Sequence, residues 1–184
     1  MSNKLRHIGL ISDEYPPDTG WGGIGTYTYN LARGLSRNGH RVTVIAGCVD
    51  QPDTTTENGI TLHRITFAPP QNKIKKIIYR SFQFYTRNRL YYRRKLEFAH
   101  AAYGLIRRLH QQKPFDLLET AEYDANGYFL ARSHRIPLVV KIHTPILTNY
   151  HLNRLVVTPE IRACDRLERW QTLRADHITT PARA

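Results

Sequence analysis

Apolar and polar positions along the first 46 residues follow the order strand, helix, strand. Residues 8–12 form a short apolar run that leads into a polar, Pro- and Gly-rich stretch over 13–25. An apolar stripe at helical spacing comes next and ends at Asn38-Gly39, and the run 41–46 is short and β-branched. The stripe consists of Ile24, Thr28, Leu31, Ala32 and Leu35. This order predicts one βαβ unit.

The same alternation continues to the end of the chain. A turn-rich link over 50–59 precedes a predicted strand over 60–65. Further strands are predicted over 116–119, 137–142 and 177–180, and further helices over 74–85, over about 96–113, over 126–134 and over 159–174. Strands that alternate with helices predict a doubly wound, mainly parallel, Rossmann-like α/β sheet with helices on both faces, formed by one domain over 1–184. Ligands of such sheets bind at the carboxyl ends of the strands.

Composition narrows the class of protein without changing this fold. The chain has 184 residues, 41% hydrophobic and 23% charged, which excludes wholesale disorder, a collagen-like repeat and a coiled coil. Its two cysteines are too few for a disulfide framework or a structural zinc site. Neither a signal-peptide core nor an apolar run of the roughly 20 residues needed to span a bilayer is present, so we expect a cytoplasmic protein.

The net charge of +12 is concentrated in one segment. Residues 73–108 contain eleven Lys and Arg and one acid, Glu97, a net +10, together with eight aromatic residues. We predict a basic, amphipathic helical insertion at about 70–112. A solvated helical face would explain it, and so would contact with an anionic membrane surface. The predicted membrane contacts are Lys73, Lys75, Lys76, Arg80, Phe82, Arg87, Arg89, Arg93 and Arg94. No nucleic-acid-binding module accompanies the charge, so we expect no nucleic acid partner.

Four glycines, Gly20, Gly22, Gly23 and Gly25, stand where the first strand turns into the first helix. Glycines there let backbone N–H groups approach an anion, and the helix N-terminus favours negative charge. A tight turn alone would need fewer of them. The letters also fit the dinucleotide fingerprint, but the loop does not follow the strand directly and no acid ends the strand 41–46. An NAD-dependent oxidoreductase is therefore the less favoured alternative.

Several short motifs in order give the chain a more specific resemblance. They are Glu14-Tyr-Pro-Pro17, Gly22-Gly-x-Gly25, Leu31-Ala-x-x-Leu35, Gly39-His-x-Val42-x-Val44, His143-Thr-Pro145, and Glu168 followed by Ala175-Asp176. With them the chain resembles the N-terminal domain of GT-B-fold retaining glycosyltransferases, the large family that includes sucrose synthases and bacterial phosphatidylinositol mannosyltransferases. It departs from the family at Ala182, where Ser is common, and it ends before the family's C-terminal, donor-binding domain.

The resemblance implies transfer of a sugar from a nucleotide-sugar donor to a glycan or lipid-linked acceptor, with retention, without a metal or other cofactor, and in polysaccharide biosynthesis. It implies that Gly22, Gly23 and Gly25 contact the donor phosphates and that His143 lies at the transferred sugar. We assign the acceptor to Tyr15, Glu119, Glu122, Tyr123 and Thr144, although a solvated acidic loop would explain Glu119 and Glu122 equally well. A non-catalytic module that binds anionic membrane surfaces remains the alternative from another class. In either case we expect a protein of the cytoplasm, peripheral at the cytoplasmic face of the membrane.

Overall fold

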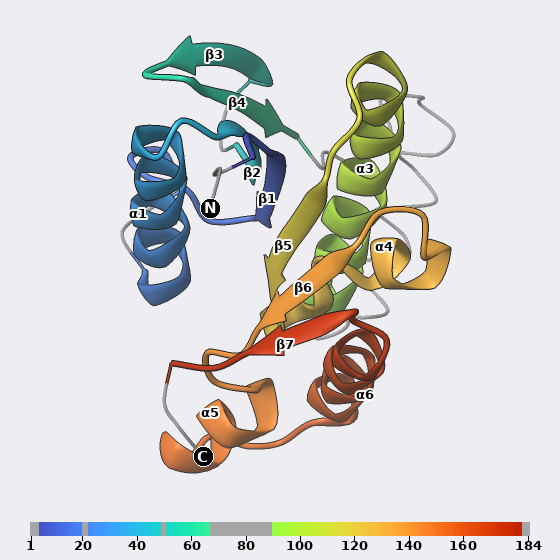
Figure 1. Cartoon of the computed structure of the whole chain (residues 1–184). Helices are drawn as coiled ribbons and strands as arrows, with labels where there is room; N and C mark the ends of the chain where they lie inside the picture. Colours follow the sequence, from blue (N-terminus) through green and yellow to red (C-terminus); the bar gives the residue numbers. More distant parts are fainter. Residues whose placement is uncertain (1–3, 20–21, 49–50, 67–89, 182–184) are drawn as a thin grey trace, which may run out of the picture.

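The computed structural model describes residues 4–19, 22–48, 51–66 and 90–181. Its elements alternate along the chain much as the sequence predicts (Figure 1). In chain order they are β1 (His7–Ser12), α1 (Gly23–Arg37), β2 (Arg41–Gly47), β3 (Asp53–Glu57), β4 (Ile60–Ile65), α3 (Leu90–Gln112), β5 (Leu117–Ala121), the 3-10 turn η1 (Tyr123–Ala125), α4 (Tyr128–Ser133), β6 (Leu138–Lys141), α5 (Ile146–Leu152), α6 (Pro159–Leu173) and β7 (His177–Thr179).

The strands form one sheet in the order β3-β4-β2-β1-β5-β6-β7. Every neighbouring pair is parallel except the β3–β4 hairpin. The chain moves outward from β1 to β2 and β4, then returns to place β5 on the other side of β1. The predicted doubly wound, mainly parallel sheet is therefore confirmed, and its order reverses between β1 and β5.

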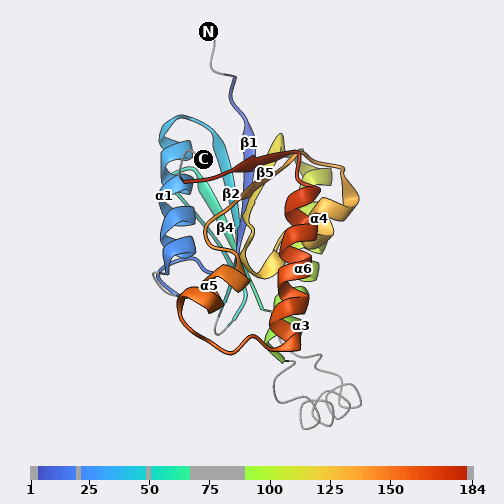
Figure 2. The same ribbon diagram turned by 90° about the horizontal axis from the view of Figure 1, so that it is seen from below.

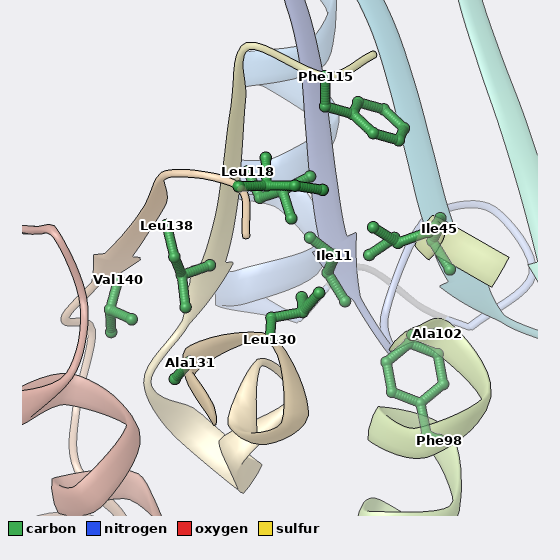
Figure 3. Close-up of a cluster of buried hydrophobic side chains, with 12 residues drawn as sticks. Ile11, Ile45, Phe98, Ala102, Phe115, Leu118, Leu130, Ala131, Leu138 and Val140 are labelled. Atoms are coloured by element: carbon green, nitrogen blue, oxygen red, sulfur yellow. The ribbon is translucent and has the colours of Figure 1, made fainter. Parts of the chain in front are cut away.

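Helices cover both faces of this sheet, with α1 on one side and α3, α4 and α6 on the other (Figure 2). One core joins Ala32 of α1 to Leu10, Val42 and Val44 of the strands. A second core lies on the opposite face, where strand residues meet side chains of α3 and α4 (Figure 3). Its members include Ile11, Ile45, Phe98, Ala102, Leu118, Leu130, Ala131, Leu138 and Val140. Burial on both faces explains why β1, whose residues are all buried, reads as a continuous apolar run.

Two elements differ from the sequence-based expectation. The link over 50–59 contains β3, whose five residues are all exposed and pair only with β4. The strand was not predicted because Thr54-Thr55-Thr56 carries no apolar alternation, and the hairpin turn at Asn58-Gly59 lies inside the predicted link. Helix α5 was also missed, since it is only 7 residues long and begins directly after Pro145.

The long helix predicted over about 96–113 is confirmed as α3. The helix predicted over 74–85 lies outside the described residues, and so do the membrane contacts predicted from Lys73 to Arg89. Arg93 and Arg94 fall at the beginning of α3, where only the backbone is described. Within the described part of the chain, no helix combines the length and the apolar character that crossing a bilayer requires.

Candidate functional site

The carboxyl ends of β1, β5 and β6 meet at one edge of the sheet, and α1 begins at the same edge (Figure 1). The turn of strand order lies there, between β1 and β5. Side chains from α1, β5 and the residues after β6 come together at this edge: Tyr27, Glu119 and His143. We call this group the carboxyl-edge site.

The glycine turn forms the beginning of α1. Gly22 is the N-cap in an extended conformation, and it makes no side-chain cap hydrogen bond because it has no side chain. A Cβ added at Gly22 would run into the Glu14 carboxylate, whereas a Cβ at Gly23 would meet nothing within 4 Å. The Glu14 carboxylate also accepts a hydrogen bond from the backbone of Gly25, and burial, followed by the charge of Asp13, raises its pKa. A carboxylate thus lies where the resemblance places a donor phosphate.

Tyr27 and Glu119 form the centre of the carboxyl-edge site. The Tyr27 hydroxyl donates to Glu119 Oε1 at 2.8 Å, and Lys141 Nζ lies 5.5 Å from the centroid of the Tyr27 ring. Burial raises the pKa of the Glu119 carboxyl, against the opposing effects of the Tyr27 hydrogen bond and the Lys141 charge. The pKa of Tyr27 is raised by burial and by the bond to Glu119, so its hydroxyl remains a hydrogen-bond donor at neutral pH.

His143 borders this pair from the loop after β6. Its ring meets the Tyr27 ring edge-on, with 4.9 Å between centroids. Burial, and next the charge of Lys141, lowers the imidazole pKa, so the ring is neutral at pH 7. Its Nε2 is buried and has no hydrogen-bond partner. A neutral imidazole nitrogen in this condition can donate to or accept from a ligand hydroxyl.

Glu122 fixes the backbone of that loop. Both of its carboxylate oxygens accept the backbone N–H of His143 at 2.8 Å, and the backbone of Thr144 adds a further hydrogen bond. The side chain is 2% exposed. The buried carboxylate therefore positions the loop that carries His143.

The remaining predicted acceptor residues are not brought together. Tyr15 is 5% exposed and packs in the α1 core, with its ring 5.7 Å from that of Tyr29. Tyr123 packs against α5, where its hydroxyl accepts from Asn149 Nδ2 at 3.4 Å. Glu119 alone combines with His143 in the carboxyl-edge site. The predicted acceptor residues all stay predictions: Tyr15, Glu119, Glu122, Tyr123 and Thr144.

A buried ionic network lies beneath the edge, and the sequence analysis missed it. Lys95 of α3 forms ion pairs with Asp13, after β1, and with Asp124 of η1, where Nζ lies 2.6 Å from Oδ2. Glu168 of α6 accepts the backbone N–H groups of Asp124 at 2.8 Å and of Ile146 at 2.9 Å. Burial raises the pKa of Glu168 to about 8. The network ties three helices and a turn to the strand ends that carry the site.

The same network holds the nearest approach to a metal site among the described residues. Ligand atoms of Asp124, Cys164 and Glu168 lie within 4.8 Å of one another. Lys95 already places its ammonium against Asp124, both Glu168 oxygens accept backbone N–H groups, and burial raises the pKa of the Cys164 thiol. The donors are therefore committed to protein partners, and their chemistry does not fit a metal ion.

Comparison with known proteins identifies the family. The sequence pattern of Glycosyltransferase Family 4 matches residues 21–184. The chain belongs to this family. A curated relative, an uncharacterized glycosyltransferase of Methanocaldococcus jannaschii, is 40% identical over 58 residues, which are 32% of this chain and 15% of the relative.

The fold of this family 4 chain is similar to parts of larger solved glycosyltransferases. Sucrose-phosphate synthase from Thermosynechococcus elongatus has a TM-score of 0.64 at 18% identity, over 94% of this chain and 41% of that one. Phytolacca americana UGT2, complexed with UDP-2fluoro-glucose and pterostilbene, has a TM-score of 0.60 at 12% identity, over 100% of this chain and 49% of that one. The catalytic domain of Arabidopsis thaliana starch synthase IV, bound to ADP and acarbose, has a TM-score of 0.53 at 21% identity, over 77% of this chain and 34% of that one. The chain spans less than half of each, and the resemblance to GT-B glycosyltransferases is confirmed.

Proposed function

We propose that this chain is the N-terminal, acceptor-side domain of a retaining glycosyltransferase. The enzyme would move a sugar from a nucleotide-sugar donor to a glycan or lipid-linked acceptor, in polysaccharide biosynthesis at the cytoplasmic face of the membrane. A second, C-terminal domain would hold most of the nucleotide. Membership of family 4 supports the transferase class, and the carboxyl-edge site supports a reaction at the carboxyl ends of β1, β5 and β6.

One observation carries the proposal: the buried, unpartnered Nε2 of His143 at the carboxyl edge. Buried polar atoms in native proteins nearly always have a partner, and an isolated one marks a place for a ligand. A sugar hydroxyl suits a neutral imidazole, which can donate or accept there. The cavity beside Tyr27, Glu119 and His143 measures about 10 Å³, far too small for a sugar, so side chains around His143 would have to move for a substrate hydroxyl to reach the buried Nε2.

The start of α1 would bind the negative charge of the donor. Backbone N–H groups of the first helical turn carry the positive end of the helix dipole; the N-cap Gly22 supplies no side-chain cap, and the Gly25 N–H donates to the Glu14 carboxylate. They would stabilise the charge that develops on the leaving diphosphate without a titrating side chain. The Glu14 carboxylate would have to leave this position or take up a proton when the donor binds.

Exchange of His143 in the enzyme that carries this domain tests the proposal. We expect His143→Ala to lower kcat/KM for sugar transfer by roughly 10²-fold, the size of effect seen when one positioned hydrogen-bond partner is removed from an active site. His177→Ala is the matched control, because His177 is exposed on β7. Equal activity of the two variants would refute the role of His143.

The second candidate, a module that binds anionic surfaces, rests on the net +10 of residues 73–108. Each Lys or Arg near anionic lipid contributes about 1 kcal/mol to membrane binding. Co-sedimentation of the chain with phosphatidylserine vesicles, compared with neutral phosphatidylcholine vesicles at low salt, decides whether this basic segment contacts lipid. Equal recovery in the two pellets would contradict the membrane contact and leave the proposed transferase untouched.

A further inference from the structure

A separate cavity opens on the other side of α1, away from the carboxyl-edge site. It measures about 530 Å³ and lies between α1, the loop after β1 and the β3–β4 hairpin. Its volume is within the range of small-molecule sites. Helix residues four apart, Tyr29, Arg33 and Arg37, form one wall, and Arg64 of β4 belongs to the facing wall. We call it the α1–hairpin cavity.

Arg64 is the best indication that this cavity binds a ligand. Its side chain is 8% exposed, and its Nε contacts Asp18 Oδ2 at 2.7 Å and, more distantly, Asp53 Oδ1 at 3.7 Å. Its Nη1 is buried and has no hydrogen-bond partner. A guanidinium group is always charged and carries five N–H donors. A buried charged donor without an acceptor is costly, and an anion bound in the cavity would supply the acceptor.

The other lining groups fit an anion that carries a sugar ring. The guanidinium groups of Arg33, Arg37 and Arg64 line the cavity together with the Glu57 carboxylate, and the carboxylates of Asp18 and Asp53 contact Arg64. Arg33 is held in place by Tyr29, because its Nη1 donates to the hydroxyl at 2.8 Å and its charge lies 5.3 Å from the ring centroid. Guanidinium forks match phosphate and carboxylate groups. The half-buried ring of Tyr29 adds flat apolar surface tipped with a hydroxyl, which suits a saccharide, and the buried Tyr15 ring lies behind it.

Ser36 of α1 and Asn58 of the hairpin turn also line the cavity. Ser36 Oγ donates to the carbonyl of Asn58, which joins α1 to the hairpin turn. Gly59 lies next to this contact with a φ of +77°, and a Cβ added there would come within 2.7 Å of Ser36 Oγ. The hairpin is therefore fixed against α1, and the cavity belongs to the folded domain.

We propose that the α1–hairpin cavity binds an anionic saccharide, a sugar that carries a phosphate or a carboxylate group, at a site distinct from that of sugar transfer. The ligand chemistry has two sources: a small sugar phosphate, or a uronic acid residue of a longer glycan. Binding at this cavity does not depend on the proposed transferase chemistry, and it is measured without turnover.

The test is titration of the chain, followed by NMR and calorimetry, with glucose 6-phosphate, with a glucuronate-containing disaccharide and with the neutral disaccharide cellobiose. We expect a charged ligand to bind and to shift the ring signals of Tyr15 and Tyr29. Binding of glucose 6-phosphate alone assigns a small sugar phosphate, and binding of the disaccharide assigns a glycan. Cellobiose should bind at least about tenfold more weakly, because it lacks the charged acceptor.

Two variants that remove the same charge separate the cavity from general electrostatics. Arg33→Gln with Arg37→Gln should lower the affinity at least about tenfold. The control, Arg41→Gln with Arg132→Gln, changes exposed residues outside the cavity and should leave the affinity within about twofold. Equal loss in both double variants, equal binding of cellobiose, no binding of either charged ligand, or signal shifts at Tyr27 and His143 in place of Tyr15 and Tyr29 would each overturn the proposal.

Discussion

Removal of the Lys95 ammonium should destabilise the whole domain. Its side chain is 18% exposed, and its two partners are more buried still, Asp13 at 14% and Asp124 at 3%. Burial disfavours the ammonium, but the charges of Asp13 and Asp124 outweigh burial and raise the pKa of Lys95. Because its pKa lies above the unfolded value, the contribution of Lys95 is fully present at neutral pH and is lost only at strongly alkaline pH.

Lys95→Met keeps the length of the side chain and leaves two carboxylates buried without their cation. Breaking a buried ion pair by removal of one partner costs about 3–5 kcal/mol. For a domain of this size, that corresponds to a fall in Tm of roughly 6–20 °C. Urea unfolding followed by circular dichroism should show it as a lower midpoint with an unchanged slope.

Arg6→Met is the matched control, since the Arg6–Asp116 pair is exposed, with side chains 48% and 34% accessible. We expect this variant to unfold at the midpoint of the wild type. Adding Asp124→Asn to Lys95→Met should recover at least about 1 kcal/mol, because one uncompensated charge disappears. A Lys95→Met midpoint that coincides with the Arg6→Met midpoint would refute a buried ionic role for Lys95.

Two further predictions concern the glycine turn in the enzyme that carries this domain. Gly23→Ala should raise the KM for the nucleotide-sugar at least about tenfold, since the added methyl group would stand over the N–H groups that face the diphosphate. The Tm should stay level or rise, because the methyl group meets nothing within 4 Å. An unchanged KM would contradict phosphate binding at the glycine turn. The affinity for UDP-glucose, whose diphosphate does not titrate near neutral pH, should rise as pH falls toward the raised pKa of Glu14, and Glu14→Gln should bind about two- to fivefold tighter at pH 7.5 with a flat profile. Fluorescence titration across pH 5–8 measures this, and an identical pH dependence of the two proteins would exclude competition by Glu14.

The strands and long helices were predictable because burial decides how the apolar residues are spaced along them. Each residue of β1 and all but the first of β2 is buried, so both read as apolar runs. Strand β3 was not predictable by the same rule, since its residues contact solvent and only pairing with β4 makes it a strand. The pattern of apolar residues in a segment reflects which of its residues are buried, and all residues of β3 are exposed.

The candidate site was predictable in position more than in detail. The end of a strand is visible in sequence, and it led to His143, but the unpartnered Nε2 and the Tyr27–Glu119 hydrogen bond depend on residues far apart in the chain. The network around Lys95 was hidden for the same reason. Lys95 stands within a basic run and was counted with its surface charge, yet its partners come from the ends of β1 and β5.

The return of the chain to β1 has a consequence for the order in which this domain folds. Strands β1 and β2 pair across a single helix, whereas β1 and β5 pair Ile8 with Leu117, and Tyr27 and Glu119 are 92 positions apart. Closure of so long a loop is slow, because its entropy is lost before any contact compensates it. A chain in which only the first four strands had paired would already contain the glycine turn and the α1–hairpin cavity. It would not yet have brought Glu119 or His143 to the carboxyl edge. The Tyr27–Glu119 contact therefore forms only once β5 has paired with β1, and His143 joins the carboxyl-edge site only once β6 has paired with β5.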